Sequence, residues 1–247
     1  MFDISQSEFN TYLYEAFRRN GIDGLLNEER ADAFYRLTAH MLEVNEQFNL
    51  TAIKDWQKVI LLHYADSLKG AEVIPEGARV IDIGCGAGFP SLPLALCRPD
   101  LTVLAIDSTA KRIGYVNETA ALLGLRNLTA RASRAEELAR DTAMRERFDC
   151  ATARAVAALP ILCELCLPFV KQGGIFAAMK GKSAKEELTA AKNAIKRLGG
   201  SDAMLYDTPL KDEKGELYAH ATVVIAKTAP TPSAYPRVYA KIVKAPL

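Results

Sequence analysis

The amino-acid sequence predicts an α/β protein built on a doubly wound, mainly parallel sheet. Apolar strand-like runs alternate with helical stretches from residue 79 onward, and a glycine-rich bend joins the first run to the first helix. Strands separated by helices of this length need right-handed crossovers, which make neighbouring strands parallel. We therefore expect three regions: an N-terminal helical cap (1–70), a sheet domain (71–228) and a basic C-terminal tail (229–247).

The N-terminal region is predicted to be helical. Apolar side chains recur every three or four residues in 29–48, the pattern of an amphipathic helix. The stretch 55–70 repeats this pattern and ends at Gly70, a residue type that commonly stops helices. No strand is evident before residue 79, so this region forms a cap and adds nothing to the sheet.

After the cap, strand and helix candidates alternate. The strand candidates are 79–83, 101–106, 148–153 and 174–179, and the helix candidates are 91–97, 110–123, 135–146, 158–170 and 184–198. Two late strand candidates, 203–207 and 217–226, are joined by a short stretch and should pair as an antiparallel hairpin. The tail contains prolines and shows no clear period.

Composition and cysteine usage indicate an intracellular globular protein. The chain is 49% hydrophobic and 25% charged, and no apolar run reaches the roughly 18 residues that a membrane span needs. The N-terminus lacks the pattern of a secretory signal, so we expect a cytoplasmic location without membrane attachment. For Cys163 and Cys166, two buried thiols are favoured over a redox or zinc site, and no feature requires a metal.

Charge is unevenly distributed although the net charge is only +1. Residues 1–70 carry 7 basic and 11 acidic side chains, whereas 171–200 carry 7 basic and 2 acidic ones. Such segregation is compatible with a basic face for nucleic acid and equally with solvated lysines on exposed elements.

The glycine-rich bend, RVIDIGCGAGFPSLPLA at 79–95, predicts a nucleotide-type pocket at the carboxyl end of the first strand. The lysine of a triphosphate-binding loop is missing, and Phe89 stands where a dinucleotide fingerprint needs its third glycine. Gly84, Gly86 and Gly88 instead follow Asp82 at alternate positions, which favours S-adenosylmethionine, with Asp82 facing its cationic methionine part. A turn that only lets helix and strand pack closely is the structural alternative.

Two further segments support a cofactor site. Asp107 closes the second strand candidate, where a carboxylate can accept hydrogen bonds from both ribose hydroxyls of either NAD or S-adenosylmethionine. In SRAEELA (133–139), Ala135 and Glu136 could face the base of the cofactor. The same segment also fits a capped helix start, with Ser133 as N-cap and Glu136 in the capping box.

Taken together, the motifs resemble the bacterial glucose-inhibited division protein B family of small-subunit ribosomal RNA guanine-N7 methyltransferases. The resemblance runs from about residue 35 to the end of the chain. It rests on the segments FNLTAI (48–53), HYADSL (63–68), DIGCGAGFPSLPLA (82–95), IDSTAKR (106–112), SRAEELA (133–139), ARAVAALPIL (153–162), MKGK (179–182), YPR and KAPL. Ser91 departs from the pattern, because the family more often has glycine there.

The resemblance implies a Rossmann-like, class I S-adenosylmethionine-dependent methyltransferase that acts on a guanine of 16S ribosomal RNA. The family's cofactor contacts map onto Gly84, Phe89, Ala135, Glu136 and Arg154. Guanine N7 carries a lone pair and no proton, so in-line methyl transfer needs no general base. No catalytic base or nucleophile is therefore expected, and Arg154 is expected to position the cofactor or the guanine. A small-molecule methyltransferase and a non-catalytic RNA-binding assembly factor are the alternatives.

Other polar residues have less certain roles at this point. Asn49, Thr51, His63 and Asp66 in the cap either form the edge of a lid over the site or only cap helices. Lys180, Lys182 and Arg237 are the candidates for contacts with RNA phosphates, which supply affinity without reading sequence. The expected partner is small-subunit ribosomal RNA or the assembling small ribosomal subunit. The protein itself is expected to be a monomer.

Overall fold

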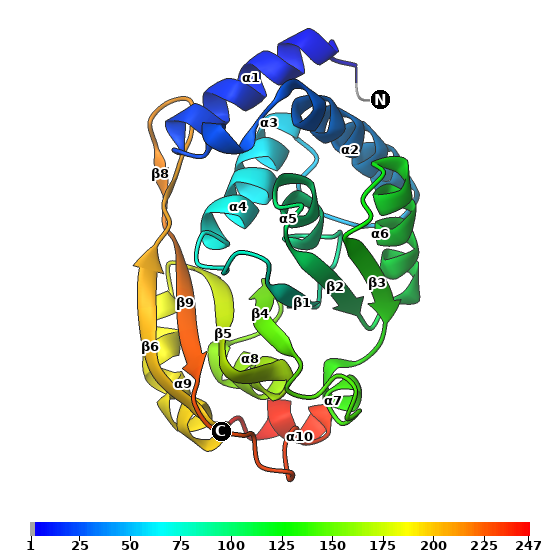
Figure 1. Ribbon diagram of the computed structural model, residues 1–247. Coiled ribbons are helices and arrows are strands. Elements are labelled where there is room, and N and C mark those ends of the chain that lie inside the picture. Colours follow the sequence, from blue (N-terminus) through cyan, green and yellow to red (C-terminus); the bar gives the residue numbers. More distant parts are fainter. Residues whose placement is uncertain (1–2) are drawn as a thin grey trace.

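The computed structural model describes residues 3–247, and its centre is a seven-stranded sheet in the order β3-β2-β1-β4-β5-β9-β6 (Figure 1). Its strands are β1 (Arg79–Ile83), β2 (Thr102–Asp107), β3 (Leu128–Ala132), β4 (Phe148–Arg154), β5 (Val170–Gly181), β6 (Gly200–Asp207) and β9 (His220–Lys227). Strands β1 to β5 are parallel, and β9 is antiparallel to both β5 and β6. This arrangement confirms the doubly wound, mainly parallel sheet with a C-terminal antiparallel hairpin.

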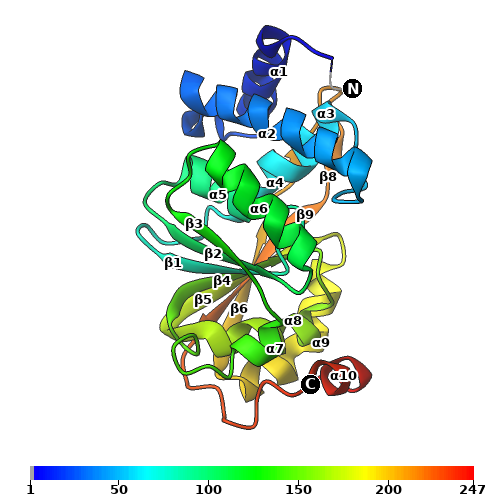
Figure 2. The ribbon, with the colours of Figure 1, turned by 90° about the vertical axis from the view of Figure 1, so that its right-hand side faces the viewer.

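Helices cover both faces of the sheet (Figure 2). They are α1 (Gln6–Arg19), α2 (Glu28–Gln47), α3 (Trp56–Val59), α4 (Asp66–Gly70), α5 (Ser91–Cys97), α6 (Ala110–Leu122), α7 (Ala135–Leu138), α8 (Leu159–Cys166), α9 (Ala184–Arg197) and α10 (Tyr239–Lys244). Helices α1 to α6 lie on one face and α7 to α10 on the other. A π-helical segment, Ile60–Ala65, joins α3 to α4. Among residues 3–247, no helix has the length and apolar character needed to cross a membrane.

The cap shares its hydrophobic core with one face of the sheet. Phe9, Phe34 and Tyr64 of the cap are fully buried in one cluster with Val80 of β1 and Leu92 of α5. Each such side chain stabilises the fold by roughly 1.5–3 kcal/mol when it leaves water. The amphipathic stripe that predicts helix 29–48 is therefore the stripe that attaches the cap to the sheet.

The structure corrects the predicted elements between residues 124 and 146. Strand β3 was not foreseen, because it is an edge strand whose exposed polar positions weaken its apolar pattern. The helix expected over 135–146 ends at Leu138 as α7. A turn follows in which the Asp141 carboxylate accepts the backbone N–H of Ala143, a local bond that competes with helix.

The second half of the chain also differs in detail. The helix expected over 158–170 ends at Cys166 and continues as a 3-10 turn, Leu167–Phe169, before β5. The hairpin carries a two-stranded extension, β7 (Leu210–Lys211) and β8 (Leu217–Tyr218), that reaches the cap beside α1 (Figure 1). There Asn20 exchanges two hydrogen bonds with the backbone of Lys211. The tail forms α10, which no period in the sequence predicted.

Candidate functional site

A cavity of about 320 Å³ lies at the carboxyl edge of the sheet, where β1, β2 and β4 end. Gly84 lines it from the glycine bend, and Asp107 lines it from the end of β2. Ala135 and Glu136 line it from the start of α7. The fold therefore brings together four of the residues that the sequence predicts for one cofactor site, from three segments of the chain between Gly84 and Glu136.

The three glycines of the bend serve different purposes. All have positive φ angles, +73° at Gly84, +55° at Gly86 and +85° at Gly88, which other residues rarely adopt. A Cβ on Gly84 would lie 2.6 Å from a methyl group of Val156, and one on Gly88 would overlap Leu92. A Cβ on Gly86 would meet no atom within 4 Å. Close packing thus explains two of the glycines, and the backbone at Gly86 faces open space.

Asp107 is held rigidly at the rim of the cavity. Its Oδ2 accepts the backbone N–H of Gly86 at 3.1 Å, and its Oδ1 accepts that of Thr109 at 2.8 Å. Arg112 lies 3.7 Å away as an ion-pair partner. Because a carboxylate offers about four lone-pair sites, two remain for a ligand's hydroxyl groups.

The start of α7 differs from the predicted capping box. Its N-cap is Arg134, and no side chain caps the helix. The Ser133 hydroxyl instead donates to the carbonyl of Arg134 at 3.4 Å, so the predicted N-cap role of Ser133 is wrong. Glu136 is 8% exposed and lies 3.8 Å from the Arg134 guanidinium. Of the two interpretations of this segment, only its place in the cavity wall fits the structure.

Asp82 does not reach the cavity, contrary to the expectation that it faces the ligand. It is fully buried and accepts hydrogen bonds from the hydroxyls of Ser91 at 2.5 Å and Thr152 at 3.3 Å. Burial raises the pKa of Asp82 to about 6, and the bond from Ser91 is the largest opposing influence. Ser91, the departure from the family pattern, therefore supplies a hydrogen bond that glycine could not.

Phe89 lies away from the cavity, beneath the cap. It is 4% exposed, and its ring stacks on His63 with centroids 4.3 Å apart and an interplanar angle of 12°. The guanidinium carbon of Arg154 lies 5.4 Å from the centre of the same ring. Among the residues described, Phe89 thus joins the cap to β4 and is not part of the cavity lining, although the resemblance implies a cofactor contact there.

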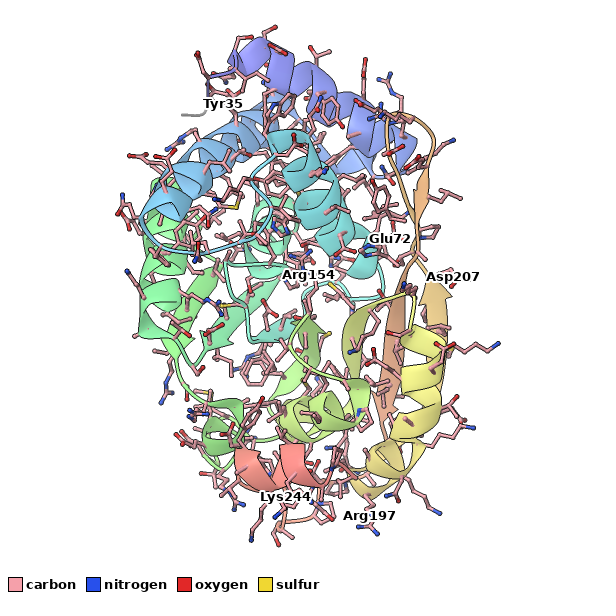
Figure 3. The ribbon with its side chains drawn as sticks, turned by 180° about the vertical axis from the view of Figure 1, so that it is seen from behind. Tyr35, Glu72, Arg154, Arg197, Asp207 and Lys244 are labelled. Carbon is pink, nitrogen blue, oxygen red and sulfur yellow. The ribbon has the colours of Figure 1, made fainter. Side chains whose placement is uncertain are left out.

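Arg154, at the end of β4, points into the cap. Its Nη1 donates to the carbonyl of Leu62 at 2.7 Å and to Asp66 at 2.9 Å, and its Nη2 contacts Nδ1 of His63 at 2.9 Å. Figure 3 shows Arg154 in the centre of the molecule, between the helices of the cap and the strands. The next residue, Ala155, has a φ of +56° and lines the cavity. This sharp bend sends Arg154 to the cap and the following residues to the cavity.

The protonation of His63 follows from its contacts. Nδ1 accepts from Arg154, so Nε2 carries the proton and donates to the hydroxyl of Thr51 at 2.9 Å. Burial and then the charge of Arg154 lower the pKa of His63 to about 3, which keeps the ring neutral at pH 7. His63 therefore orients Arg154 as an acceptor and carries no charge of its own.

Asp66 completes this arrangement. Burial alone would raise its pKa, but hydrogen bonds and charges from His220 and Arg154 outweigh burial and lower it. Nδ1 of His220, at the start of β9, lies 2.6 Å from Asp66. We call Thr51, His63, Asp66, Arg154 and His220 the cap cluster. Of the four cap residues with two possible roles, Thr51, His63 and Asp66 thus form contacts within the protein, and Asn49 is exposed. No spacing in the sequence predicts that His220 belongs to this cluster.

Two of the three residues predicted to contact phosphate, Lys180 and Arg237, have carboxylate partners within the protein. Nζ of Lys180 donates to the carbonyl of Ala157 at 2.6 Å and pairs with Glu187 at 2.7 Å, and its side chain is 8% exposed. Arg237 binds the fully buried Glu164 through Nε and Nη2 at 2.9 and 2.6 Å. Lys182 is exposed. Cys163 and Cys166 are free buried thiols, as predicted.

Comparisons with known proteins agree with this geometry. A family model described as rRNA small subunit methyltransferase G (GidB) matches residues 30–213. The chain is 44% identical over 214 residues to ribosomal RNA small subunit methyltransferase G of Halalkalibacterium halodurans, which covers 86% of this chain and 89% of that relative. It is 42% identical over 246 residues to the protein of the same name from an Exiguobacterium species, covering 99% and 100%.

A solved structure shows the fold. The chain superimposes on a SAM-dependent O-methyltransferase of Thermotoga maritima with a TM-score of 0.51 and 14% identity, over 78% of this chain and 72% of that one. This likeness confirms the class I, Rossmann-like methyltransferase fold. The family model, which matches most of the sequence, and the relatives, which match nearly all of it, together show that the chain is a methyltransferase and belongs to the rRNA small subunit methyltransferase G family.

Proposed function

We propose that the chain transfers a methyl group from S-adenosylmethionine to N7 of a guanine in small-subunit (16S) ribosomal RNA. The observation that carries this proposal is the cavity at the carboxyl edge of the sheet, lined by Gly84, Asp107, Ala135 and Glu136. The relatives are named for methylation of small-subunit ribosomal RNA, and the structural neighbour is named SAM-dependent. The relatives' names support ribosomal RNA as the substrate, and the neighbour's name supports S-adenosylmethionine as the methyl donor.

The residues of the cavity fit S-adenosylmethionine. The free lone pairs of Asp107 suit the two ribose hydroxyls. Gly86 is not among the described residues that line the cavity, and its backbone N–H holds the Asp107 carboxylate. Ala135 and Glu136, at the start of α7, suit the adenine end. When bound, the cofactor supplies an electrophilic methyl group on a sulfonium. Gly88 and Phe89 contribute through the shape of the bend and its packing.

The proposed reaction depends on how the guanine and the methyl donor are positioned, and it involves no proton abstraction from N7. N7 of guanine has a lone pair and no proton, so the chain needs no general base. The buried thiols and the neutral His63 are accordingly absent from the chemistry that we propose. Holding the guanine in line with the methyl group and excluding water supply the rate enhancement.

Arg154 is a positioning residue in this proposal. Its guanidinium is fixed by Asp66, His63 and Leu62, and the backbone that follows it turns directly into the cavity wall at Ala155. The cap cluster therefore sets the position of the loop after β4, which borders both the cofactor and the expected place of the guanine.

The proposed partner is the small-subunit ribosomal RNA, alone or in an assembling subunit, in the cytoplasm and with the chain acting as a monomer. Five free cysteines, all buried, fit a reducing compartment. The exposed Lys182, just after the carboxyl end of β5, remains the candidate for a phosphate contact.

The test is transfer of a labelled methyl group from S-adenosylmethionine to four substrates: unmodified small subunits, naked 16S ribosomal RNA, transfer RNA and a pool of metabolites. Digestion to nucleosides then identifies the labelled product. We expect 7-methylguanosine from small subunits or from their RNA. Label in a metabolite, or in another position of the base, would contradict the proposed substrate, and no label at all would contradict the activity.

A further inference from the structure

The C-terminal tail contributes a side chain to the cavity. Tyr239, the first residue of α10, lines it together with Ala135 and Glu136 of α7 and Leu165 of α8. Figure 1 shows α10 beside α7 and α8, and helices α8 and α10 are in contact. Tyr239 lies outside the segment that the family model matches, which ends at residue 213. Nothing in the glycine bend or the strand ends predicts this contribution.

The tail is anchored so that Tyr239 has a fixed place. Two residues before it, Arg237 binds the buried Glu164 of α8 by its side chain and also by its backbone N–H at 2.7 Å. Three residues after it, Ile242 is fully buried in the core on this face of the sheet. The tyrosine therefore sits between two attachments to the same layer of helices.

Further bonds hold the chain that leads to α10. Nη1 of Arg145 donates to the carbonyl of Tyr235 at 2.9 Å, and Nη2 donates to that of Thr231 at 2.7 Å. Arg140 donates to the carbonyl of Pro236 at 2.5 Å. Arginine side chains reach the tail's backbone from the loop after α7, so the cavity wall and the tail are tied to each other.

We propose that the ring of Tyr239 forms one wall of the adenine end of the cofactor site, and thus that the C-terminal tail is part of this site. The inference rests on the proposed function, because it takes S-adenosylmethionine as the ligand. Tyr239 is 40% exposed although its helix is docked, and an aromatic ring open to a cavity offers a face on which a purine can stack.

The position of the ring assigns it to the adenine and not to the ribose or the methionine part. Asp107, at the end of β2, suits the ribose, and α7 follows β3, the outer neighbour of β2, so the start of α7 suits the adenine beyond the ribose. Tyr239 lines the cavity with the start of α7 and with Leu165, which belong to the face of the sheet that α10 covers. Loss of the ring should therefore weaken any ligand that carries the adenine, whatever its sulfur substituent.

The experiment compares four full-length proteins: wild type, Tyr239→Ala, Tyr239→Phe and Val238→Ala. Val238 is the matched control, because it is the exposed neighbour of Tyr239 and is not among the described residues that line the cavity. Calorimetry measures the Kd of S-adenosylhomocysteine, and competition measures that of 5′-methylthioadenosine. Thermal unfolding checks that each variant is folded.

We expect Tyr239→Ala to weaken both ligands by the same factor, about 10-fold, which is the size of a lost aromatic stacking contact. Tyr239→Phe should restore most of the affinity, and Val238→Ala should match wild type. The inference is wrong if Tyr239→Ala binds both ligands like wild type, or if only S-adenosylhomocysteine is weakened. If the wild type binds neither ligand, the proposed function fails as well, so the two failures are distinguishable.

Discussion

The helical cap and the C-terminal tail lie on opposite faces of the same sheet, and they are attached in different ways. The cap is held by a continuous apolar core that includes Phe9, Phe34 and Tyr64, all fully buried. The tail buries one large aliphatic side chain completely, Ile242, and is otherwise held by ion pairs and hydrogen bonds such as Arg237 to Glu164. Burial of apolar side chains therefore attaches the cap to the sheet, whereas ion pairs and hydrogen bonds attach the tail.

The difference changes what a buried charge does in each region. In the cap, packing already fixes position, and we propose that the cap cluster acts on the site through Arg154. In the tail, the charge of Arg237 is needed for attachment itself. Removing a charge from the cap cluster should therefore affect activity most, and removing one from the tail should affect stability and local order most.

The largest effect is expected from Arg154→Ala. It removes the group that joins β4 to Asp66 and His63 and leaves the bend at Ala155 without support. We expect kcat/KM for methyl transfer to fall by about 100-fold, because small displacements of reacting groups cost this much. Radiolabelled transfer to small subunits measures the change. Unchanged kinetics in a folded Arg154→Ala protein would show that the cap cluster is structural only.

A large loss of stability is expected from Arg237→Ala. Among the described residues, the change leaves the buried Glu164 carboxylate with one partner, a backbone N–H, and breaking such a pair costs about 3 kcal/mol of unfolding free energy. Urea denaturation measures the loss. Hydrogen exchange should show faster exchange over 239–244 and unchanged exchange over 30–44 in the cap. Equal loosening of both regions would contradict the comparison drawn above, and Arg237→Lys, which keeps the charge, should give a smaller loss.

A smaller, pH-dependent effect is expected from Ser91→Ala. The folded-state pKa of Asp82, about 6, lies above its ordinary value of 3.8, so its burial destabilises the protein increasingly as pH rises from about 4 through 6. The Ser91 hydroxyl offsets part of this cost, because it hydrogen-bonds the carboxylate. Removing it should cost about 2 kcal/mol at pH 8 and less than about 1 kcal/mol at pH 5.

Denaturation of both proteins at the two pH values checks this prediction. Thr152→Val is the matched control, since Thr152 makes the longer bond to the same carboxylate, 3.3 Å against 2.5 Å, and should show a weaker pH dependence. A loss of stability for Ser91→Ala that is larger at pH 5 than at pH 8 would mean that the hydroxyl does not stabilise the charged form.

The smallest effect is expected from Lys182→Ala. This prediction compares the exposed Lys182 with Lys180, whose charge is paired within the protein. Loss of one phosphate contact in Lys182→Ala should reduce affinity for 16S ribosomal RNA about threefold and lower the slope of log K against log salt by about 0.7 to 1. Lys180→Ala should instead lower stability, because its charge is paired with Glu187, and leave the salt slope unchanged. Filter binding over a salt series measures both. If Lys180→Ala changed the salt slope and Lys182→Ala did not, Lys180 and not Lys182 would be the residue that contacts phosphate.

The sheet and the glycine bend could be predicted from the sequence, because both produce local sequence patterns. Apolar runs, helical stripes and closely spaced glycines can each be recognised within a few residues of sequence. Once the strands are assigned, their carboxyl ends indicate that Asp107 and Glu136 lie in one cavity. Strand β3 and α10 leave weak patterns, since one is a half-exposed edge and the other is a short helix with one fully buried side chain.

The partners of charged residues were harder to predict than the charges themselves. Lys180 and Arg237 look like surface cations in the sequence, but each has an internal carboxylate brought close only by the tertiary fold. His220 joins Asp66 across more than 150 residues, and Tyr239 reaches the cavity from the far end of the chain. Long-range pairings of this kind have no period or spacing that could reveal them.

The most direct test of the account is calorimetric titration of the folded protein with S-adenosylhomocysteine. We expect one binding site in the wild type and a loss of affinity of about 10-fold or more in Asp107→Ala, because two hydroxyl groups lose their acceptor. Asp100→Ala, which changes an aspartate at the opposite edge of the sheet, should bind like wild type. A folded wild type that gives no binding heat and no protection against thermal unfolding with this ligand would contradict the claim that the cavity is a cofactor site.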